Sequence, residues 1–106
     1  MSFFDPMFSV DFTERLAAAR AVPGHVLVDV RGASSFAEGH IPGAILIPHD
    51  RVKELAESVL TDKNQLILVY CRSGRRSKLA AEDLLKLGYT NIKEFGGILD
   101  WPYEVE

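Results

Sequence analysis

Hydrophobic and polar positions follow two patterns along the chain, which predict alternating strands and helices. Short apolar runs rich in β-branched residues predict four strands, at residues 25–30, 44–47, 66–70 and 92–95. Between them, apolar residues at helical spacing predict helices over 11–21, 51–60 and 77–87, with one helical turn over 34–38. This alternation is typical of an α/β domain with a largely parallel sheet, and a length of 106 residues suits a single domain over residues 1–106.

Turn and capping residues agree with these boundaries. Asp11, followed three positions later by Glu14, forms a capping-box-like pair at the start of the first helix, which Pro23 and Gly24 end. Gly88 is suited to cap the helix over 77–87, and the Gly96-Gly97 pair predicts a turn after the last strand. The run LILVY at 66–70 carries the strongest signal for a buried central strand.

Composition narrows the possible functions. A net charge of −3 argues against general nucleic-acid binding, and no apolar stretch approaches the ~20 residues of a membrane span. The N-terminal MSFFDPMF lacks the basic start of a signal peptide. A single cysteine can form neither an internal disulfide nor a cysteine-rich zinc site, and the histidines lack metal-ligand spacing, so we expect no metal and no cofactor. These features favour a cytoplasmic protein.

That one cysteine, Cys71, lies between the strongest strand and the next helix, where ligand sites of open α/β sheets occur. The positive end of the helix dipole usually attracts acids, but here it carries Arg75, Arg76 and Lys78, and the first acid is Glu82. A broken local rule of this kind points to a functional site where an anion supplies the missing charge. We expect that anion to be the Cys71 thiolate, a bound substrate, or both, and we expect the pKa of Cys71 to be lowered. The alternative is a buried structural cysteine beside solvated arginines.

Three separated motifs then resemble one family. VYCRSGRRS resembles the active-site loop of rhodaneses, C-R-x-G-x-R-[AS]; VDVRGASSFAEGHIPGA resembles their D-x-R…E-x-G-H-I-P-G-A segment, and GGILDW their G-G-x-x-x-W ending. The match covers about residues 10–101 in the family's order. It implies a rhodanese-like α/β fold with a central parallel sheet of about five strands and helices on both faces.

The resemblance also implies a chemistry, sulfur transfer through a persulfide on Cys71. The thiolate attacks the outer sulfur of a donor such as thiosulfate, and a thiophilic acceptor (cyanide in the standard assay, a thiol or a protein) then removes the sulfur. Arginines suit bidentate contacts with an anionic donor, and Gly74 allows the backbone N–H groups to curl around the sulfur. The expected donor-binding residues, all in the loop after the cysteine, are Arg72, Ser73, Gly74, Arg75, Arg76 and Ser77.

Three alternatives remain open at this point. Phosphatases and arsenate reductases of related architecture hold their cysteine in a C-x5-R loop, whereas Cys71 to Arg76 is C-x4-R, a smaller cup suited to one sulfur atom. A non-catalytic rhodanese-like module would usually have lost the cysteine. A persulfide carrier serving a protein or small-thiol acceptor cannot be separated from a thiosulfate–cyanide enzyme by any motif. The three arginines favour thiosulfate over mercaptopyruvate as donor.

Other polar residues have supporting roles in this interpretation. Asp29 and Arg31 end the strand over 25–30, at the same sheet edge as Cys71, and could orient its loop; an Arg31–Glu38 ion pair is the simpler alternative for Arg31. We expect His40 to brace its loop by a hydrogen bond. Because side chains alternate along a strand, Tyr70 should face away from Cys71. Trp101 is expected to pack in the core or on the C-terminal segment.

Overall fold

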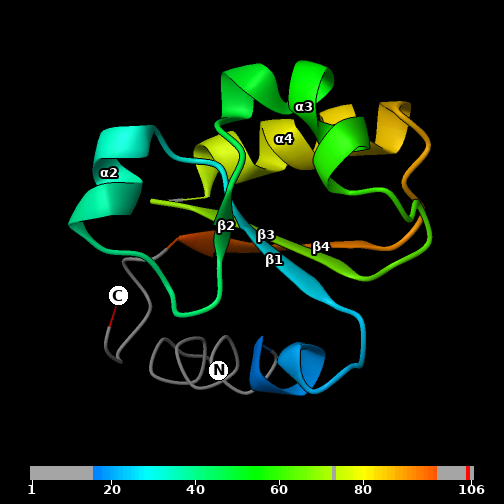
Figure 1. The fold of residues 1–106 in the computed structure, drawn as a ribbon, viewed down its shortest axis with the longest axis horizontal. Coiled ribbons are helices and arrows are strands. Elements are labelled where there is room, and N and C mark those ends of the chain that lie inside the picture. The colour runs from blue at the N-terminus through cyan, green and yellow to red at the C-terminus, as the bar shows by residue number, and fades with distance from the viewer. Residues whose placement is uncertain (1–15, 73, 98–104, 106) are drawn as a thin grey trace, which may run out of the picture.

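A computed structural model describes residues 16–72, 74–97 and 105, and its centre is a parallel sheet. The strands are β1 (Val26–Asp29), β2 (Ile45–Leu46), β3 (Ile67–Cys71) and β4 (Ile92–Gly97), in the order β2-β1-β3-β4 (Figure 1). Each pair of neighbours is parallel, with Val28 opposite both Ile45 and Val69. The carboxyl ends of all four strands therefore lie at one edge of the sheet.

The sequence prediction of the fold class is confirmed, and one expected turn is wrong. The described residues form four of the about five expected strands, and these four correspond to the four apolar runs. The Gly96-Gly97 pair is not a turn: β4 continues to Gly97, which lies opposite Cys71 beyond an irregularity in the pairing of β3 with β4. Pairing with the neighbouring strand thus overrides the turn preference of the two glycines.

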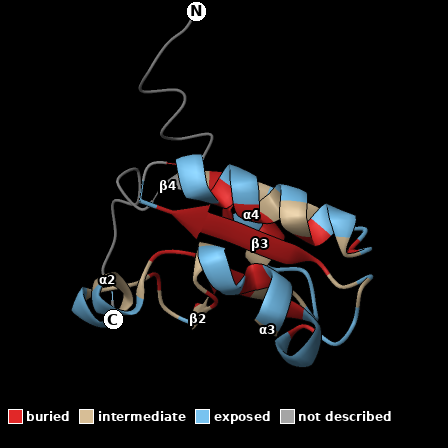
Figure 2. Cartoon of the chain, turned by 90° about the horizontal axis from the view of Figure 1, so that it is seen from above, coloured by how far each residue is buried: buried red, intermediate tan, exposed pale blue. Residues whose placement is uncertain are grey.

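Helices cover both faces of the sheet, as expected. Helices α3 (Val52–Val59) and α4 (Arg75–Lys86) pack on one face, where they enclose a core that includes Val28, Val69 and Cys71. The other face is covered by helical residues 16–20, with Leu16 and Ala19 in the core, and by Phe36 of α2 (Ala33–Glu38). A short 3-10 helix, η1 (His49–Arg51), leads into α3. Figure 2 shows β3 in view between α3 and α4, buried along its length.

The connection from β3 to α4 places the cysteine at the sheet's carboxyl edge. Cys71 is the last residue of β3, and α4 starts at Arg75, two residues earlier than the pattern predicts. The helix ends at Lys86, and Gly88 follows with a positive φ of 99°, so the predicted glycine cap is present. Among the described residues, no helix is long and apolar enough to cross a membrane. The predicted Asp11–Glu14 cap and Trp101 lie outside the described residues.

Candidate active site

A pocket of about 380 Å³ opens at the carboxyl edge of the sheet, with the cysteine in its wall. Cys71 is only 2% exposed. The residues that line the pocket come from β3, the start of α4 and the segment after β1. They are Arg31, Ser35, Cys71, Arg72, Arg75 and Arg76. Four of these six residues are arginines, in a chain whose net charge is −3. The pocket is therefore a local concentration of positive charge around one thiol.

Backbone and hydroxyl groups surround the Cys71 sulfur from the loop side. The Gly74 N–H donates a hydrogen bond to Sγ at 2.9 Å, and Ser77 Oγ lies 3.5 Å from Sγ. An N–H directed at sulfur favours the charged thiolate over the neutral thiol. The first turn of α4 adds the positive end of its dipole and contains no acidic residue. An N–H donor and the positive end of a helix dipole thus both lie beside the sulfur.

Gly74 makes this geometry possible because of its conformation and its close neighbours. Its φ is 101°, a region that residues with a Cβ rarely occupy, and it forms the N-cap of α4. A Cβ placed there would lie 3.1 Å from Gly96 Cα in β4. The loop therefore packs directly on the backbone of β4, and a glycine is required at this position.

Glu94, in β4, is a functional candidate that the sequence prediction missed. Its Oε2 accepts hydrogen bonds from the Gly96 N–H at 2.6 Å and from Ser77 Oγ at 2.5 Å. Ser77, in turn, is completely buried and contacts the Cys71 sulfur. An acidic side chain thus approaches the start of α4 from another strand, although none precedes Glu82 within the helix. The only sequence signal was a charged residue beside the buried Phe95 in a short strand.

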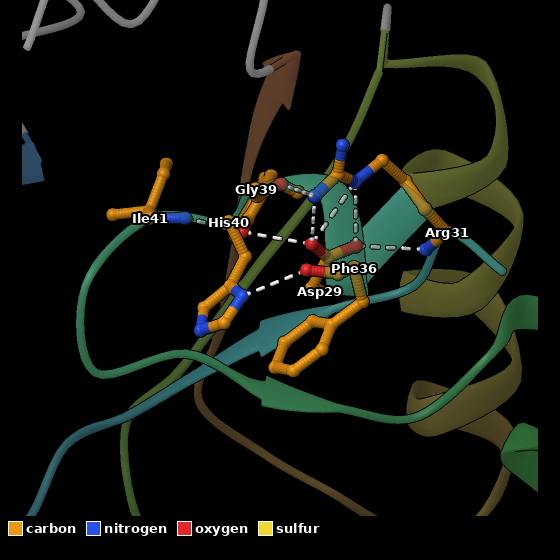
Figure 3. A network of polar contacts seen from close by, with 7 residues as sticks. Asp29, Arg31, Phe36, Gly39, His40 and Ile41 are labelled. Carbon is orange, nitrogen blue, oxygen red and sulfur yellow. Dashed lines mark hydrogen bonds and ion pairs between the residues drawn. The ribbon is translucent and has the colours of Figure 1, made fainter. Parts of the chain in front are cut away.

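Asp29 and Arg31 form a buried ion pair beside the pocket (Figure 3). Arg31 Nη2 lies 2.6 Å from Asp29 Oδ2, and Arg31 Nε and the backbone N–H of Arg31 also donate to this carboxylate. The hydrogen bond with Asp29 raises the pKa of Arg31 above its ordinary value, although burial opposes it. Arg31 therefore pairs with Asp29, and not with Glu38 as in the simpler alternative, because the i,i+2 carboxylate is buried beside it.

The same ion pair is tied to two neighbouring segments. Arg31 Nη2 donates to the Gly39 carbonyl at 2.6 Å, and the Tyr70 hydroxyl donates to Asp29 Oδ2 at 2.8 Å. The Ile41 N–H completes the group by donating to the Tyr70 hydroxyl oxygen at 3.0 Å. Tyr70 packs in the core on the face of the sheet opposite Cys71, as side-chain alternation predicts. The network thus fixes the loop after α2 to the centre of the sheet.

His40 braces that loop in the predicted way. Its Nδ1 lies 2.9 Å from the Phe36 carbonyl, so this nitrogen donates, and the two rings stack at 3.7 Å (Figure 3). The imidazole is thus engaged in holding the end of α2. Among the described residues, no group of three or more His, Cys, Asp or Glu side chains is placed to hold a metal ion.

The structure brings most of the predicted site residues together, but some line the pocket and others lie behind the sulfur. Arg72, Arg75 and Arg76 are exposed at the pocket, and the buried Arg31 also lines it. Gly74 and Ser77 lie behind the sulfur, so Ser77 contacts Cys71 and not the open pocket. Ser35 lines the pocket without having been predicted, since only folding brings α2 near Cys71. Ser73 lies outside the described residues.

Comparison with known proteins agrees with this geometry. Residues 11–103 match the rhodanese-like domain. The thiosulfate sulfurtransferase PspE of Escherichia coli is 41% identical over 73 residues, which cover 69% of this chain and 70% of PspE. The putative sulfur carrier protein YrkF of Bacillus subtilis is 35% identical, over 76% of this chain and 43% of YrkF.

Other matches are longer proteins or solved structures. The adenylyltransferase and sulfurtransferase UBA4 of Meyerozyma guilliermondii is 39% identical, but the aligned part is only 21% of that protein. A solved structure described as a rhodanese with anions from E. coli superimposes with a TM-score of 0.72 at 36% identity, covering 77% of this chain and 96% of the other. Because one domain match spans most of the chain and PspE is matched over two thirds of its length, the chain belongs to the rhodanese family.

Proposed function

We propose that this protein is a thiosulfate sulfurtransferase that carries sulfur as a persulfide on Cys71. The observation that carries the proposal is the buried Sγ at an arginine-lined pocket, with the Gly74 N–H directed at it. Thiosulfate is a small dianion, which suits a site with four arginines, since guanidinium groups bind oxyanions through paired N–H donors. The name of the relative PspE supports the same donor. The single cysteine suits the reducing cytoplasm, where we place the reaction.

In the first step the Cys71 thiolate attacks the outer sulfur of thiosulfate. A bond forms between Sγ and that sulfur, the sulfur–sulfur bond of thiosulfate breaks, and its electron pair leaves with sulfite. Arg72, Arg75 and Arg76 hold the negative charge that shifts from the thiolate to the departing sulfite. Because they are exposed at the pocket, sulfite leaves directly to solvent.

In the second step an acceptor attacks the terminal sulfur, and the electrons of the broken bond return to Cys71 as thiolate. The chain has no second cysteine, so the persulfide cannot collapse to an internal disulfide and must pass its sulfur to a partner. Cyanide, a thiol or a protein can fill this role. The match to a putative sulfur carrier protein favours a persulfide carrier for a protein acceptor as the second candidate.

A phosphatase or arsenate reductase is a weaker alternative on this geometry. The loop from Cys71 to Arg76 has one residue fewer between cysteine and arginine than those enzymes use. The nearby acid, Glu94, is hydrogen-bonded to Ser77 behind the sulfur and is not among the residues that line the pocket. It is thus badly placed to protonate a leaving group.

Intact-protein mass spectrometry tests the proposal directly. We expect thiosulfate to add one sulfur, about 32 Da, which cyanide then removes with release of thiocyanate. Cys71→Ala should show no gain, and mercaptopyruvate should load the protein more slowly than thiosulfate. Absence of the adduct on a thiol that is shown to be free, or turnover of p-nitrophenyl phosphate without any sulfur loading, would refute the proposal.

A further inference from the structure

The sulfur-transfer steps above assign no role to Glu94, yet only the Ser77 side chain lies between its carboxylate and the reacting sulfur. Oε2 accepts from the Gly96 N–H and contacts Ser77 Oγ, and the same Ser77 Oγ lies 3.5 Å from Cys71 Sγ. Ser77 is fully buried, so its hydroxyl is shielded from water, whereas the Glu94 carboxylate is partly exposed. The chain of contacts therefore runs from Glu94 through one hydroxyl group to the thiol.

The hydroxyl of Ser77 has one proton and several neighbours that compete for it. Its oxygen neighbours are Glu94 Oε2 at 2.5 Å, the Gly74 carbonyl at 3.0 Å and the Gly96 carbonyl at 3.4 Å. Carbonyls and an ionised carboxylate only accept hydrogen bonds, and the charged acceptor makes the stronger bond. The proton of Ser77 therefore points at Glu94, and a lone pair of Oγ faces the sulfur.

This orientation matters for the charge on sulfur. A lone pair accepts a hydrogen bond from the neutral S–H but repels a thiolate, and the carboxylate charge behind Ser77 acts in the same sense. We propose that Glu94 is a positioning residue which, through Ser77, keeps the Cys71 sulfur protonated up to a higher pH than the surrounding arginines alone would allow. Glu94 thus opposes, without cancelling, the Gly74 N–H and the helix dipole.

The other charged groups around the sulfur explain why such an opposing charge is useful. Arg72, Arg75 and Arg76 face the pocket from the loop and α4, and Arg31 faces it from the end of β1, where Asp29 offsets its charge. All four arginines favour the thiolate. A thiolate with a very low pKa is always ionised but is a poor nucleophile, and the best attacking thiol has a pKa near the ambient pH. Glu94 raises the pKa of Cys71 back toward that optimum. This advantage rests on the proposed function, in which Cys71 is the nucleophile.

The experiment measures the alkylation rate of the single thiol by iodoacetamide as a function of pH. We expect Glu94→Gln, which keeps an acceptor for the Gly96 N–H but removes the charge, to lower the midpoint by about one pH unit, a small shift for the loss of a nearby charge. Glu82→Gln removes the same charge from an exposed position on α4 and should leave the midpoint unchanged. An unchanged or raised midpoint in Glu94→Gln would overturn the proposal.

Two further variants test the route through Ser77. With Ser77→Ala in the background, Glu94→Gln should shift the midpoint less than half as far, because the hydroxyl that transmits the effect is absent. An equal shift would mean that Glu94 acts only through space, and would overturn the role of Ser77. Glu94→Asp keeps the charge but draws the carboxylate back from Ser77, so we expect a lowered midpoint here too. A wild-type midpoint in that variant contradicts the proposal even if Glu94→Gln fails to fold.

These measurements are independent of sulfur transfer. Alkylation requires no thiosulfate, so the Glu94 proposal can fail while the wild-type protein forms its persulfide. Conversely, a wild-type protein that takes no sulfur from thiosulfate refutes the proposed function and leaves the midpoint shift to be judged separately. If both hold, Glu94→Gln should form the persulfide about threefold more slowly at a pH where both thiols are ionised, since nucleophilicity falls with pKa.

Discussion

At the scale of single residues, the site depends on the backbone at Gly74 as much as on the Cys71 thiol. The Gly74 N–H points at the sulfur because the backbone φ is 101° there. The close packing on Gly96 leaves no room for a side chain. Both the backbone conformation and the packing thus require a glycine at position 74. The chain offers a natural comparison in Gly24, whose φ is 80° but whose Cβ would meet nothing within 4 Å.

Replacing Gly74 by alanine should therefore damage both stability and sulfur transfer. We expect a loss of ~1–2 kcal/mol from the left-handed backbone alone, more from the contact with Gly96, and at least a tenfold slower persulfide formation as the N–H moves away from sulfur. Urea unfolding and the rate of sulfur loading measure the two effects. Gly24→Ala should show the backbone cost with an unchanged loading rate. Equal loading rates in the two variants would contradict this role for Gly74.

At the scale of elements, the Asp29–Arg31 pair joins β1, β3 and the loop after α2. The Asp29 carboxylate is completely buried and accepts hydrogen bonds from Arg31 and Tyr70, while Arg31 also holds the Gly39 carbonyl. A buried charge that loses its partner is costly, because water cannot replace the partner. The network therefore keeps Arg31 at the edge of the pocket as well as holding the elements together.

Asp29→Asn should destabilise the protein strongly because it leaves the Arg31 charge buried without its counter-ion. We expect a loss of about 3–5 kcal/mol in the free energy of unfolding, measured by urea denaturation. The exposed pair of Arg51 with Glu54 supplies the control, since Glu54→Gln should cost ~1 kcal/mol or less. Similar losses in the two variants would mean that the buried network contributes no more than a surface ion pair.

The elements themselves were predictable from the sequence because their signals are local. Four apolar runs became the four strands, and helical spacing located α3 and α4. Where the prediction failed, the determining contact was distant in sequence: Gly97 belongs to β4 because it pairs with Cys71. The described residues contain four of the about five strands that the family resemblance implies.

The site divides in the same way between local and distant contributions. Cys71 and the arginines that follow were predictable because they are consecutive in the chain and break the usual charge preference of a helix start. Ser35 and Glu94 were not, because α2 and β4 bring them to the site through folding. The sulfur and three of the four pocket arginines thus come from the end of β3 and the start of α4, whereas Ser35 and Glu94 come from two other elements.

At the scale of the whole molecule, the buried tyrosine in the network links stability to pH. Burial raises the pKa of Tyr70 well above its ordinary value, and the neighbouring Asp29 charge adds to this effect. In the unfolded chain the same phenol ionises near pH ~10. As pH rises above that value, the unfolded state loses the proton and gains stability while the folded state keeps it. Stability from this group is thus complete below pH ~10 and declines above it.

Tyr70→Phe separates this effect from the other groups that titrate at high pH, since they are present in both proteins. At pH 7 we expect the variant to be less stable by about 1–3 kcal/mol, because the Ile41 N–H and Asp29 Oδ2 each lose a buried hydrogen bond. From pH ~10 upward the difference should shrink, by up to ~1.4 kcal/mol for each pH unit. Urea unfolding of both proteins between pH 7 and 11 measures it. A difference that is the same at pH 11 as at pH 7 would show that Tyr70 ionises equally easily in both states, contrary to its place beside Asp29.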